Sequence, residues 1–301
     1  MSFRTRFAPS PTGPLHLGHA FSAMLAHHAA RDAGGAFLLR IEDLDQDRCR
    51  PAWEAQIIDD LRWLGLTWDG PVRRQSEHIP LYENALETLI HQGLVFPCSC
   101  SRADIRAAMS APQQGYANIG PDGPAYPGTC RHRPMADRQP GDALRLNMRR
   151  AVQQLGAAPL VFVETGAGKR GQQIAAPDWL TDRVGDIVLG RRGNGQVAYH
   201  LAVVVDDAAQ TISHVIRGED LFEATAIHVL LQRLLGLPTP VYHHHRLIRD
   251  DAGKRLAKRD DARAIARYRA DGLSPDDIAR MVTFQAIGAI SSCSSPSTTA
   301  V

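Results

Sequence analysis

The sequence lacks several features that would assign it to a class at once. Its 301 residues carry a formal net charge of only +2, so no overall basic excess indicates a nucleic-acid partner, and any RNA-binding surface must be local. It has no apolar run long enough to cross a bilayer and no signal peptide, so we expect a cytoplasmic protein without a membrane partner. Its 5 cysteines are an odd number, which favours a reducing compartment and a metal over a disulfide framework.

The chain does have enough apolar sequence for a core, because 44% of its residues are hydrophobic, and its length fits two domains. The most informative stretch is residues 6–19, R-F-A-P-S-P-T-G-P-L-H-L-G-H. Residues 2–7 predict a short strand. The prolines and glycine at 9–14 exclude a helix or a central strand, and apolar residues at helical spacing follow them. The pattern predicts a strand, a tight loop and the start of a helix.

Such a helix start is suited to an anion, because its first N–H groups are unpaired and the helix dipole is positive there. His16 and His19 are three residues apart and share one face of the first turn, while Gly18 lets a flat group approach the backbone. These residues predict a site for a nucleoside triphosphate. The alternative is two surface histidines after a proline-rich turn, which the preceding P-S-P-T-G disfavours.

A second buried strand at 37–41 leads into Glu42-Asp43-Leu44-Asp45. Strand, helix and strand then form a parallel crossover, the first half of a doubly wound sheet, in which ligands bind at the carboxyl ends of the strands. Glu42 lies at that edge, where an acidic residue either binds a ligand or is simply solvated. Residues 52–64 and 80–92 predict the next two helices.

Three thiols then gather in a segment rich in glycine and proline. Cys98 and Cys100 form C-x-C, and Cys130 follows. Thiolates at this density indicate a closed, structural zinc site with tetrahedral geometry. On chemistry alone His132 is the better fourth ligand, and three reduced cysteines without a metal are the alternative. A helix over 102–109 lies between the two parts of the cluster.

The second half of the chain returns to the parallel sheet. Residues 143–165 alternate apolar and polar positions, and together with 186–191 they predict antiparallel strands of a smaller inserted domain. Y-H-L-A-V-V-V-D-D at 199–207 and H-V-I-R-G-E-D-L at 214–221 predict two strands of the main sheet. An amphipathic helix over 225–235 follows.

The last part of the chain begins with a strand at 241–248 that contains three consecutive histidines, 243–245. Alternate side chains of a strand face opposite sides, so we do not expect the three to bind one metal. Two helices are predicted over 260–276 and 274–288. The low-complexity tail, 291–301, is expected to be disordered.

Residues 6–19 resemble the first signature of class I aminoacyl-tRNA synthetases, in the form used by glutamyl and glutaminyl enzymes. R-I-E-D at 40–43 and R-G-E-D at 217–220 resemble further patterns of that family. R-L-A-K-R at 255–259 resembles the second class I signature, K-M-S-K-S, with Arg for the first Lys and Ala for the Ser. On its own this segment would be a basic surface loop, but both signatures occur in the expected order.

The resemblance implies an α/β fold with a Rossmann-type doubly wound parallel sheet, an inserted smaller α+β domain that contains zinc, and a C-terminal helical segment. The expected parts are a first catalytic half, an inserted acceptor-binding-like domain, a second catalytic half, a loop with a helical segment, and the tail, at 1–95, 96–185, 186–240, 241–290 and 291–301. We expect a monomer.

The resemblance also assigns roles to single residues. Glu42 would receive the α-amino group of glutamate and Arg217 its side-chain carboxylate. His16, His19 and Lys258 would be catalytic. The glutamate set is Arg6, Ala8, Ser10, Glu42, Tyr199 and Arg217, and the ATP set is Pro9, Thr12, His16, Gly18, His19, Leu247, Ile248 and Lys258.

The resemblance bears on the zinc ligands as well. Y-x-x-x-C after C-x-C resembles the short glutamyl-queuosine enzymes of the family and implies Cys98, Cys100, Tyr126 and Cys130. C-x-H, by contrast, resembles some bacterial glutamyl-tRNA synthetases and would use His132.

The implied reaction joins L-glutamate to ATP with Mg²⁺, giving glutamyl-adenylate and pyrophosphate. Because only a few tens of residues follow Lys258, too few for a large anticodon-binding domain, we expect the shortened branch, which transfers glutamate to queuosine in the anticodon of tRNA(Asp).

Three alternatives remain. A truncated or discriminating glutamyl-tRNA synthetase would charge a tRNA 3′ end. A small-molecule adenylyltransferase would not need Arg6, Glu42 and Arg217. An inactive RNA-binding paralogue would tolerate the loss of the residues expected to be catalytic.

Overall fold

The computed structural model describes residues 2–109, 119–156, 158–192, 197–248 and 263–282. The predicted loop around Lys258 and the predicted tail lie outside these residues. Within the described residues, no helix is both long enough and apolar enough to span a membrane.

The first half of the fold is a parallel crossover. β1 (Arg4–Phe7) pairs in parallel with β2 (Ala36–Ile41), and α1 (Leu17–Asp32) connects them. α1 ends at Asp32 with Ala33 as its C-cap, and Gly34 then adopts a φ of +59°, which suits a residue without a Cβ. β3 (Arg73–Arg74) extends the sheet in parallel beyond β2.

Two further helices flank this half. α2 (Pro51–Trp63) and α3 (Ile79–His91) each begin with a proline in their first turn, where the missing N–H is not needed. A 3₁₀ turn (Gln75–His78) leads from β3 into α3.

The second half contains the strands β11 (His214–Gly218), β12 (Val241–His245), β8 (Leu160–Glu164) and β9 (Gly171–Ala175) in that order. β12 is parallel to both β11 and β8, whereas β9 is antiparallel to β8. The helices α7 (Tyr199–Ala209) and α8 (Thr225–Leu234) pack beside them, and a 3₁₀ turn (Glu219–Leu221) follows β11.

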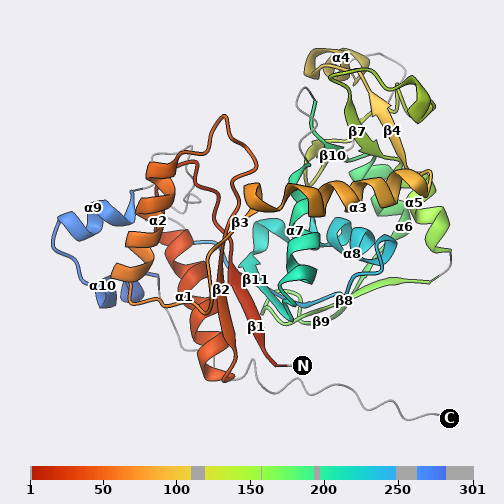
Figure 1. Ribbon diagram of the computed structural model, residues 1–301. Helices are drawn as coiled ribbons and strands as arrows, with labels where there is room; N and C mark the ends of the chain where they lie inside the picture. The colour runs from red at the N-terminus through yellow and green to blue at the C-terminus, as the bar shows by residue number, and fades with distance from the viewer. Residues whose placement is uncertain (1, 110–118, 157, 193–196, 249–262, 283–301) are drawn as a thin grey trace, which may run out of the picture.

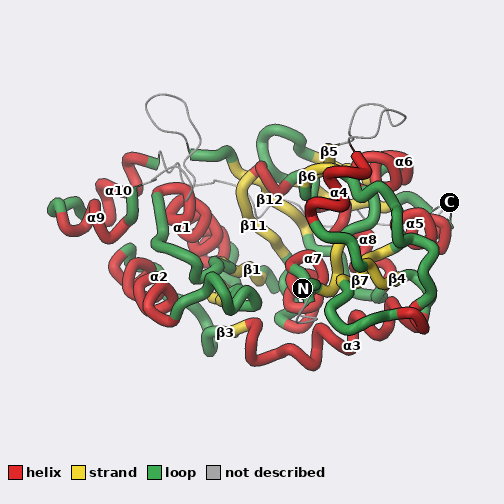
Figure 2. Tube along the Cα trace, turned by 90° about the horizontal axis from the view of Figure 1, so that it is seen from above, coloured by secondary structure: helices red, strands yellow, loops and turns green. Residues whose placement is uncertain are grey.

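The two halves meet between β1 and β11. The N–H of Ser213 donates to the carbonyl oxygen of Arg4 at 3.0 Å, and the N–H of Arg4 donates to Ser213 Oγ at 2.8 Å. From this junction β1, β2 and β3 follow one another outward on one side, and β11 and β12 do so on the other, so the junction is the topological switch point of a doubly wound sheet. Seen from above, α1 and α2 lie on one side of β1 and β11, and α7 and α8 on the other (Figure 2).

Side chains that alternate along β2 supply two cores. Phe37, Leu39 and Ile41 are fully buried in the cluster that includes α1 and α2. Leu38 packs against the other cluster, which includes α3, α7 and α8. A strand that is apolar on both faces is typical of a parallel sheet covered by helices on both sides.

A smaller antiparallel sheet stands apart in the upper right of Figure 1. It consists of β4 (Val95–Cys98), β7 (Ala143–Leu146) and β10 (Val188–Gly190). We call residues 95–109, 119–147 and 186–190 the cysteine subdomain. It also contains α4 (Arg102–Met109), the two-residue strands β5 (Ile119–Gly120) and β6 (Gly123–Pro124), and a 3₁₀ turn (Met135–Asp137).

Short helices complete the described chain. α5 (Met148–Leu155), α6 (Pro177–Trp179) and a π-helical turn (Leu180–Val184) lie near the cysteine subdomain. α9 (Ile265–Ala270) and α10 (Pro275–Met281) pack near α1 and α2 on the left of Figure 1. They lie within the two stretches, 260–276 and 274–288, for which the sequence predicts C-terminal helices.

Two strand predictions were wrong. Residues 199–207 form the helix α7, not a strand: all sides of it are buried from Leu201 to Val205, so its sequence has no helical periodicity, and three consecutive valines favour a strand. Residues 160–165 do not join the inserted antiparallel sheet. Their strand, β8, pairs with β12 through Glu164 and Tyr242, and α5 separates it from β7.

Candidate active site

A cavity of about 470 Å³ opens at the carboxyl ends of β1, β2, β11 and β12. It brings together every residue of the predicted glutamate and ATP sets that the structure describes. These are Arg6, Ala8, Pro9, Ser10, Thr12, His16, Gly18, His19, Glu42, Tyr199, Arg217, Leu247 and Ile248. Lys258, the remaining member of the ATP set, lies outside the described residues.

Sequence reasoning missed several other residues of the lining: Phe7, Ser22, Ile216, Gly218, Asp220, Leu221 and His245. Asp220 could have been predicted from the sequence, because it belongs to the R-G-E-D stretch at the end of β11. His245 could not, since the three histidines were predicted to be ordinary strand residues. Their partners differ: His243 contacts Thr165, His244 contacts Glu164, and His245 lies edge-on to Phe21.

The start of α1 is capped by the two signature histidines. His16 Nδ1 accepts a hydrogen bond from the N–H of Gly18 at 3.1 Å, and His19 Nδ1 accepts one from the N–H of His16 at 3.2 Å. This is a capping box built from imidazoles, and the rings stack with centroids 3.8 Å apart. Because Nδ1 accepts in each neutral ring, the proton is on Nε2, so each ring has an Nε2–H donor at the helix N-terminus.

Gly18 lies close against this stacked pair. A Cβ on residue 18 would lie 3.0 Å from His16 Cε1, a tight contact that would require the His16 ring to shift slightly. The glycine therefore serves the placement of His16 as well as the close approach of a ligand.

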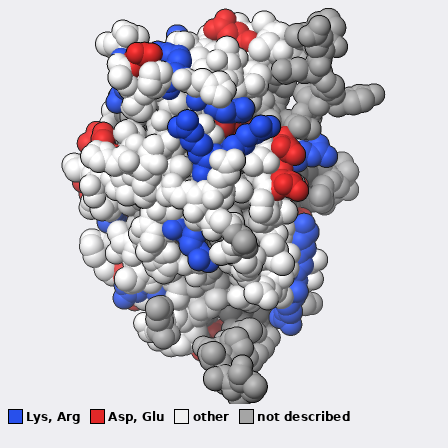
Figure 3. All heavy atoms as spheres, turned by 90° about the vertical axis from the view of Figure 1, so that its right-hand side faces the viewer, with Lys and Arg blue, Asp and Glu red and all other residues white. Residues whose placement is uncertain are grey.

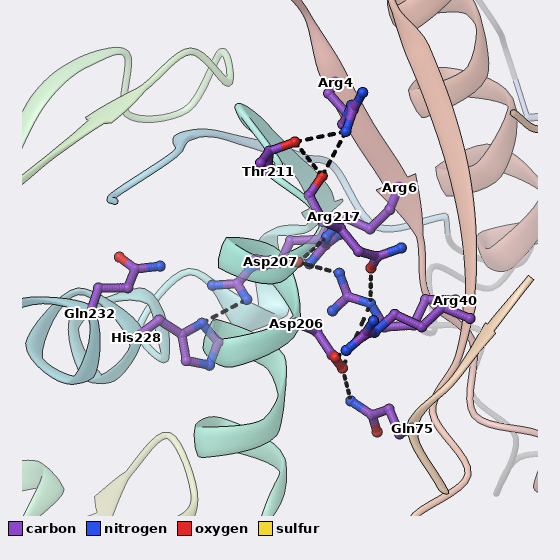
Figure 4. Close-up of polar contacts among 12 residues, drawn as sticks. Arg4, Arg6, Arg40, Gln75, Asp206, Asp207, Thr211, Arg217, His228 and Gln232 are labelled. Atoms are coloured by element: carbon purple, nitrogen blue, oxygen red, sulfur yellow. Dashed lines mark hydrogen bonds and ion pairs between the residues drawn. The ribbon is translucent and has the colours of Figure 1, made fainter. Parts of the chain in front are cut away.

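Arg6 is buried and its charge is matched. Its Nε donates to Asp207 Oδ1 at 2.9 Å and its Nη2 to Asp207 Oδ2 at 3.3 Å. Arg40, which is fully buried, also binds Asp207, so one carboxylate of α7 serves two arginines from β1 and β2 (Figure 4). Burial raises the pKa of Asp207, but Arg6 and Arg40 outweigh it and hold the pKa below its ordinary value.

Arg217 is buried too, but within the described chain its hydrogen bonds all go to neutral groups. Nε donates to His244 Nε2 at 3.1 Å and Nη1 to His228 Nδ1 at 3.0 Å. Nη2 donates to Thr225 Oγ1 at 2.8 Å and to the carbonyl oxygen of Leu221 at 3.1 Å. Among the described residues, the guanidinium of Arg217 is thus held in place without an ion pair to a carboxylate.

Glu42 adds an acidic group that titrates near neutrality. Burial raises its pKa to about 7, against the lowering effects of Arg40 and Arg6. Its N–H donates to the carbonyl oxygen of Pro9 at 3.0 Å, which ties the end of β2 to the proline-rich loop. Tyr199 is the neighbouring polar group, and burial together with Glu42 raises its pKa to about 12.

The cysteine subdomain holds a compact cluster of possible metal ligands. The Sγ atoms of Cys98, Cys100 and Cys130 all lie within 4.8 Å of one another. The hydroxyl of Tyr126 lies 3.3 Å from Cys98 Sγ and 3.4 Å from Cys100 Sγ. His132 is not part of this group among the described residues, so the geometry favours Tyr126 as the fourth ligand.

The chemistry of the cluster fits a zinc ion. Burial raises the pKa of the Cys130 thiol, but hydrogen bonding with Tyr126 and Ser99 outweighs it and lowers the pKa to about 6. A thiol that ionises this readily is a good metal ligand, and three thiolates with one oxygen are a suitable donor set for tetrahedral zinc.

Comparison with known families identifies the class. A family model described as "tRNA synthetases class I (E and Q), catalytic domain" matches residues 2–291. The chain belongs to this family and is an enzyme of the synthetase type. This confirms the predicted α/β class I fold.

Several relatives that this chain resembles share one name. A protein of Rhodobacter capsulatus named Glutamyl-Q tRNA(Asp) synthetase is 63% identical over 278 residues, covering 92% of this chain and 99% of the relative. Proteins of the same name from Symbiobacterium thermophilum and Nocardia farcinica are 42% and 44% identical, and each match covers 83% of the relative.

A solved structure agrees with the fold. The glutamate tRNA ligase of Elizabethkingia meningosepticum, solved in complex with its amino acid, superposes with a TM-score of 0.74 at 28% identity. The match covers 94% of this chain and 60% of that chain, so this chain corresponds to somewhat over half of the ligase.

Proposed function

We propose that the protein activates L-glutamate with ATP and Mg²⁺ and transfers the glutamyl group to queuosine in the anticodon of tRNA(Asp). One observation carries the proposal: a single cavity combines two buried arginines, a carboxylate that titrates near pH 7, and a helix N-terminus capped by two imidazoles. Glutamate has two carboxylates and one ammonium group, and ATP supplies phosphates for the helix end.

The charges of the cavity favour glutamate over glutamine. Arg6 already pairs with Asp207, which it shares with Arg40, whereas Arg217 bonds to neutral groups within the described residues and keeps its charge for a ligand. An amide side chain would leave this buried charge unmatched, and sites of this kind discriminate strongly against such analogues. Glu42 in its ionised form would receive the α-amino group.

ATP would lie between the helix end and the strand ends. The Nε2–H groups of His16 and His19 would meet its phosphates, and Leu247 and Ile248 would offer backbone groups to adenine. Lys258 would meet phosphate charge that develops during adenylyl transfer. Mg²⁺ would enter with the nucleotide and neutralise part of that charge.

The chemistry proceeds in two transfers. An oxygen of the glutamate α-carboxylate attacks the α-phosphorus in line, forming glutamyl-adenylate and releasing pyrophosphate. A hydroxyl oxygen of the queuosine cyclopentenediol then attacks the glutamyl carbonyl, and AMP leaves. The protein contributes mainly positioning and charge stabilisation.

The choice of tRNA acceptor is supported by the names of the similar proteins. A modified anticodon base would have to leave its stack to reach the cavity. On the face in Figure 3, the Lys and Arg side chains of the described residues form separate groups with acidic side chains between them rather than one extended basic patch. We infer a cytoplasmic monomer, with Cys98, Cys100, Tyr126 and Cys130 holding one structural zinc ion.

A second candidate is a minimal glutamyl-tRNA synthetase that charges a tRNA 3′ end, which the similarity to a solved glutamate tRNA ligase favours. The two are separated by incubating the protein with ATP, labelled glutamate and either queuosine-containing tRNA(Asp) or tRNA(Glu). We expect label on the anticodon nucleoside of tRNA(Asp). Label on the 3′ end of tRNA(Glu) would establish the second candidate instead.

Activation is tested separately by glutamate-dependent pyrophosphate exchange without tRNA. We expect exchange with glutamate, none with glutamine, and a loss of exchange in Arg217→Gln, whose amide lacks the charge. Surface variant Arg233→Gln, on the same helix as His228 but outside the cavity lining, is the control. Equal exchange with glutamine would contradict the assigned role of Arg217.

A further inference from the structure

A chain of hydrogen bonds leads from Arg217 out of the cavity to the cysteine subdomain. Arg217 Nη1 lies 3.0 Å from His228 Nδ1, and His228 Nε2 lies 3.0 Å from His200 Nδ1. His200 Nε2 lies 2.8 Å from a carboxylate oxygen of Asp122. Figure 4 shows the first step, with Arg217 reaching from β11 to His228 on α8.

The donors and acceptors of this chain have only one consistent arrangement. A guanidinium can only donate, so His228 Nδ1 accepts and its proton is on Nε2. That proton is donated to His200 Nδ1, and His200 in turn donates its Nε2–H to Asp122. Both imidazoles are neutral, which agrees with the lowered pKa of buried His228.

The nitrogen held by this chain is the one that retains a proton for a ligand. Arg217 has five N–H bonds, and the described partners take the Nε–H, both protons of Nη2 and one of Nη1. The remaining N–H is on Nη1, beside His228. The direction of that bond depends on where His228 is placed, because His228 holds the same nitrogen.

A second support reaches Arg217 from the sheet. His244 accepts from Arg217 Nε, and its own Nδ1 binds Glu164. Glu164 also accepts from the N–H groups of His244 and Gly166, so this support is built from β8, β12 and the turn that follows β8. The support through His228 differs, because it ends at Asp122 in the cysteine subdomain.

Asp122 belongs to the turn between β5 and β6, and its side chain is 54% exposed. This turn packs closely against the π-helical turn, since a Cβ at Gly120 would overlap the carbonyl oxygen of Arg183. Tyr126 of the cysteine cluster lies four residues further along. The turn therefore connects the cluster to the imidazole chain.

We propose that Asp122, His200 and His228 are positioning residues that aim Arg217 Nη1 at the anionic ligand, so that the cysteine subdomain sets the affinity of the cavity for that ligand. The proposal rests on the proposed function insofar as the ligand is glutamate. None of the three residues lines the cavity, so they act through Arg217.

The test uses Asp122→Ala in the full chain, because a half-exposed carboxylate can be removed without emptying the core. Loss of one hydrogen bond at the end of the chain should raise the KM for glutamate in pyrophosphate exchange by about 3- to 10-fold. The KM for ATP and kcat should change by less than about twofold, because the helix end is untouched. Asp122→Asn should restore the wild-type KM, since its amide oxygen still accepts from His200. Asp137→Ala, another exposed carboxylate of the same subdomain, is the matched control.

Histidine ¹⁵N NMR supplies a readout that needs no activity. We expect the Nε2–H tautomer on His200 and His228 in the wild type and a loss of this preference in Asp122→Ala. An unchanged glutamate KM in a folded Asp122→Ala variant, or Nδ1–H tautomers in the wild type, would overturn the proposal. A wild-type protein with these tautomers but without glutamate-dependent exchange would overturn the proposed function, while the hydrogen-bond arrangement of His200 and His228 would be confirmed.

Discussion

Replacing the buried Asp207 should cost this protein much stability for a small change in shape. Its carboxylate accepts from Arg6 at 2.9 and 3.3 Å and binds Arg40 as well. The two arginines are only 5% and 0% exposed. Replacing Asp207 with Asn keeps the volume and one acceptor oxygen but leaves two buried guanidinium charges without their shared carboxylate.

The magnitude follows from that burial. Removing one partner of a buried ion pair typically costs about 3–5 kcal/mol, a large share of the roughly 5–15 kcal/mol that stabilises a domain. We therefore expect Asp207→Asn to lower the free energy of unfolding in urea by about 3–5 kcal/mol. The control is Asp59→Asn, which breaks the exposed pair between Asp59 and Arg269 and should cost less than about 1 kcal/mol.

The pH dependence supplies an independent check. The pKa of Asp207 is below its ordinary value of 3.8, so its ionised form adds stability that is present above that pH. This stability is lost as the pH falls through the lower, folded-state pKa, and Asp207→Asn should flatten that acid limb. A loss below about 1 kcal/mol at pH 7, or an acid limb identical to the wild type, would show that Arg6 and Arg40 do not depend on Asp207.

Three further predictions concern the cavity and the cysteine cluster. Because the pKa of Glu42 is about 7, bound glutamate should drive release of about half a proton at pH 7, measured by calorimetry in buffers of different ionisation enthalpy, and Glu42→Gln should abolish it. Gly18→Ala should lower kcat/KM for ATP on the order of 10-fold by displacing the His16 ring, and unchanged kinetics would contradict this reading of the stacked pair. Cys98→Ser or a chelator should remove zinc, detected by elemental analysis, and lower the melting temperature, whereas Cys49→Ser, a cysteine outside the cluster, should retain the metal.

Much of the fold could be predicted because its signals are local. The prolines and glycine at 9–14 exclude regular structure, and the histidines that follow mark the start of α1. Both faces of β2 are buried, and the consecutive apolar residues at 37–39 already indicate this in the sequence. Helices 51–63 and 79–91 were predicted to within one residue at each end.

The errors occurred where burial removes the periodic signal. α7 is surrounded by protein, so its apolar run is equally compatible with a strand, and only its packing against α3 and α8 decides between them. The membership of β8 in a sheet is likewise a matter of which strand it meets across a long separation in the chain, here β12. No local pattern contains that information.

The sequence by itself determined the chemical types and their order along the chain: the histidine-capped helix start, the acidic end of β2, the arginine that ends β11, and the clustered thiols. Local chemistry is enough for this, since capping, turn formation and metal ligation depend on residue type and short spacing. The tertiary structure alone decided how the charges are matched. It gave Arg6 a carboxylate from α7, gave Arg217 neutral hydrogen-bond partners within the described residues, and connected His228 through His200 to Asp122, because contacts between separate elements depend on packing rather than on local spacing.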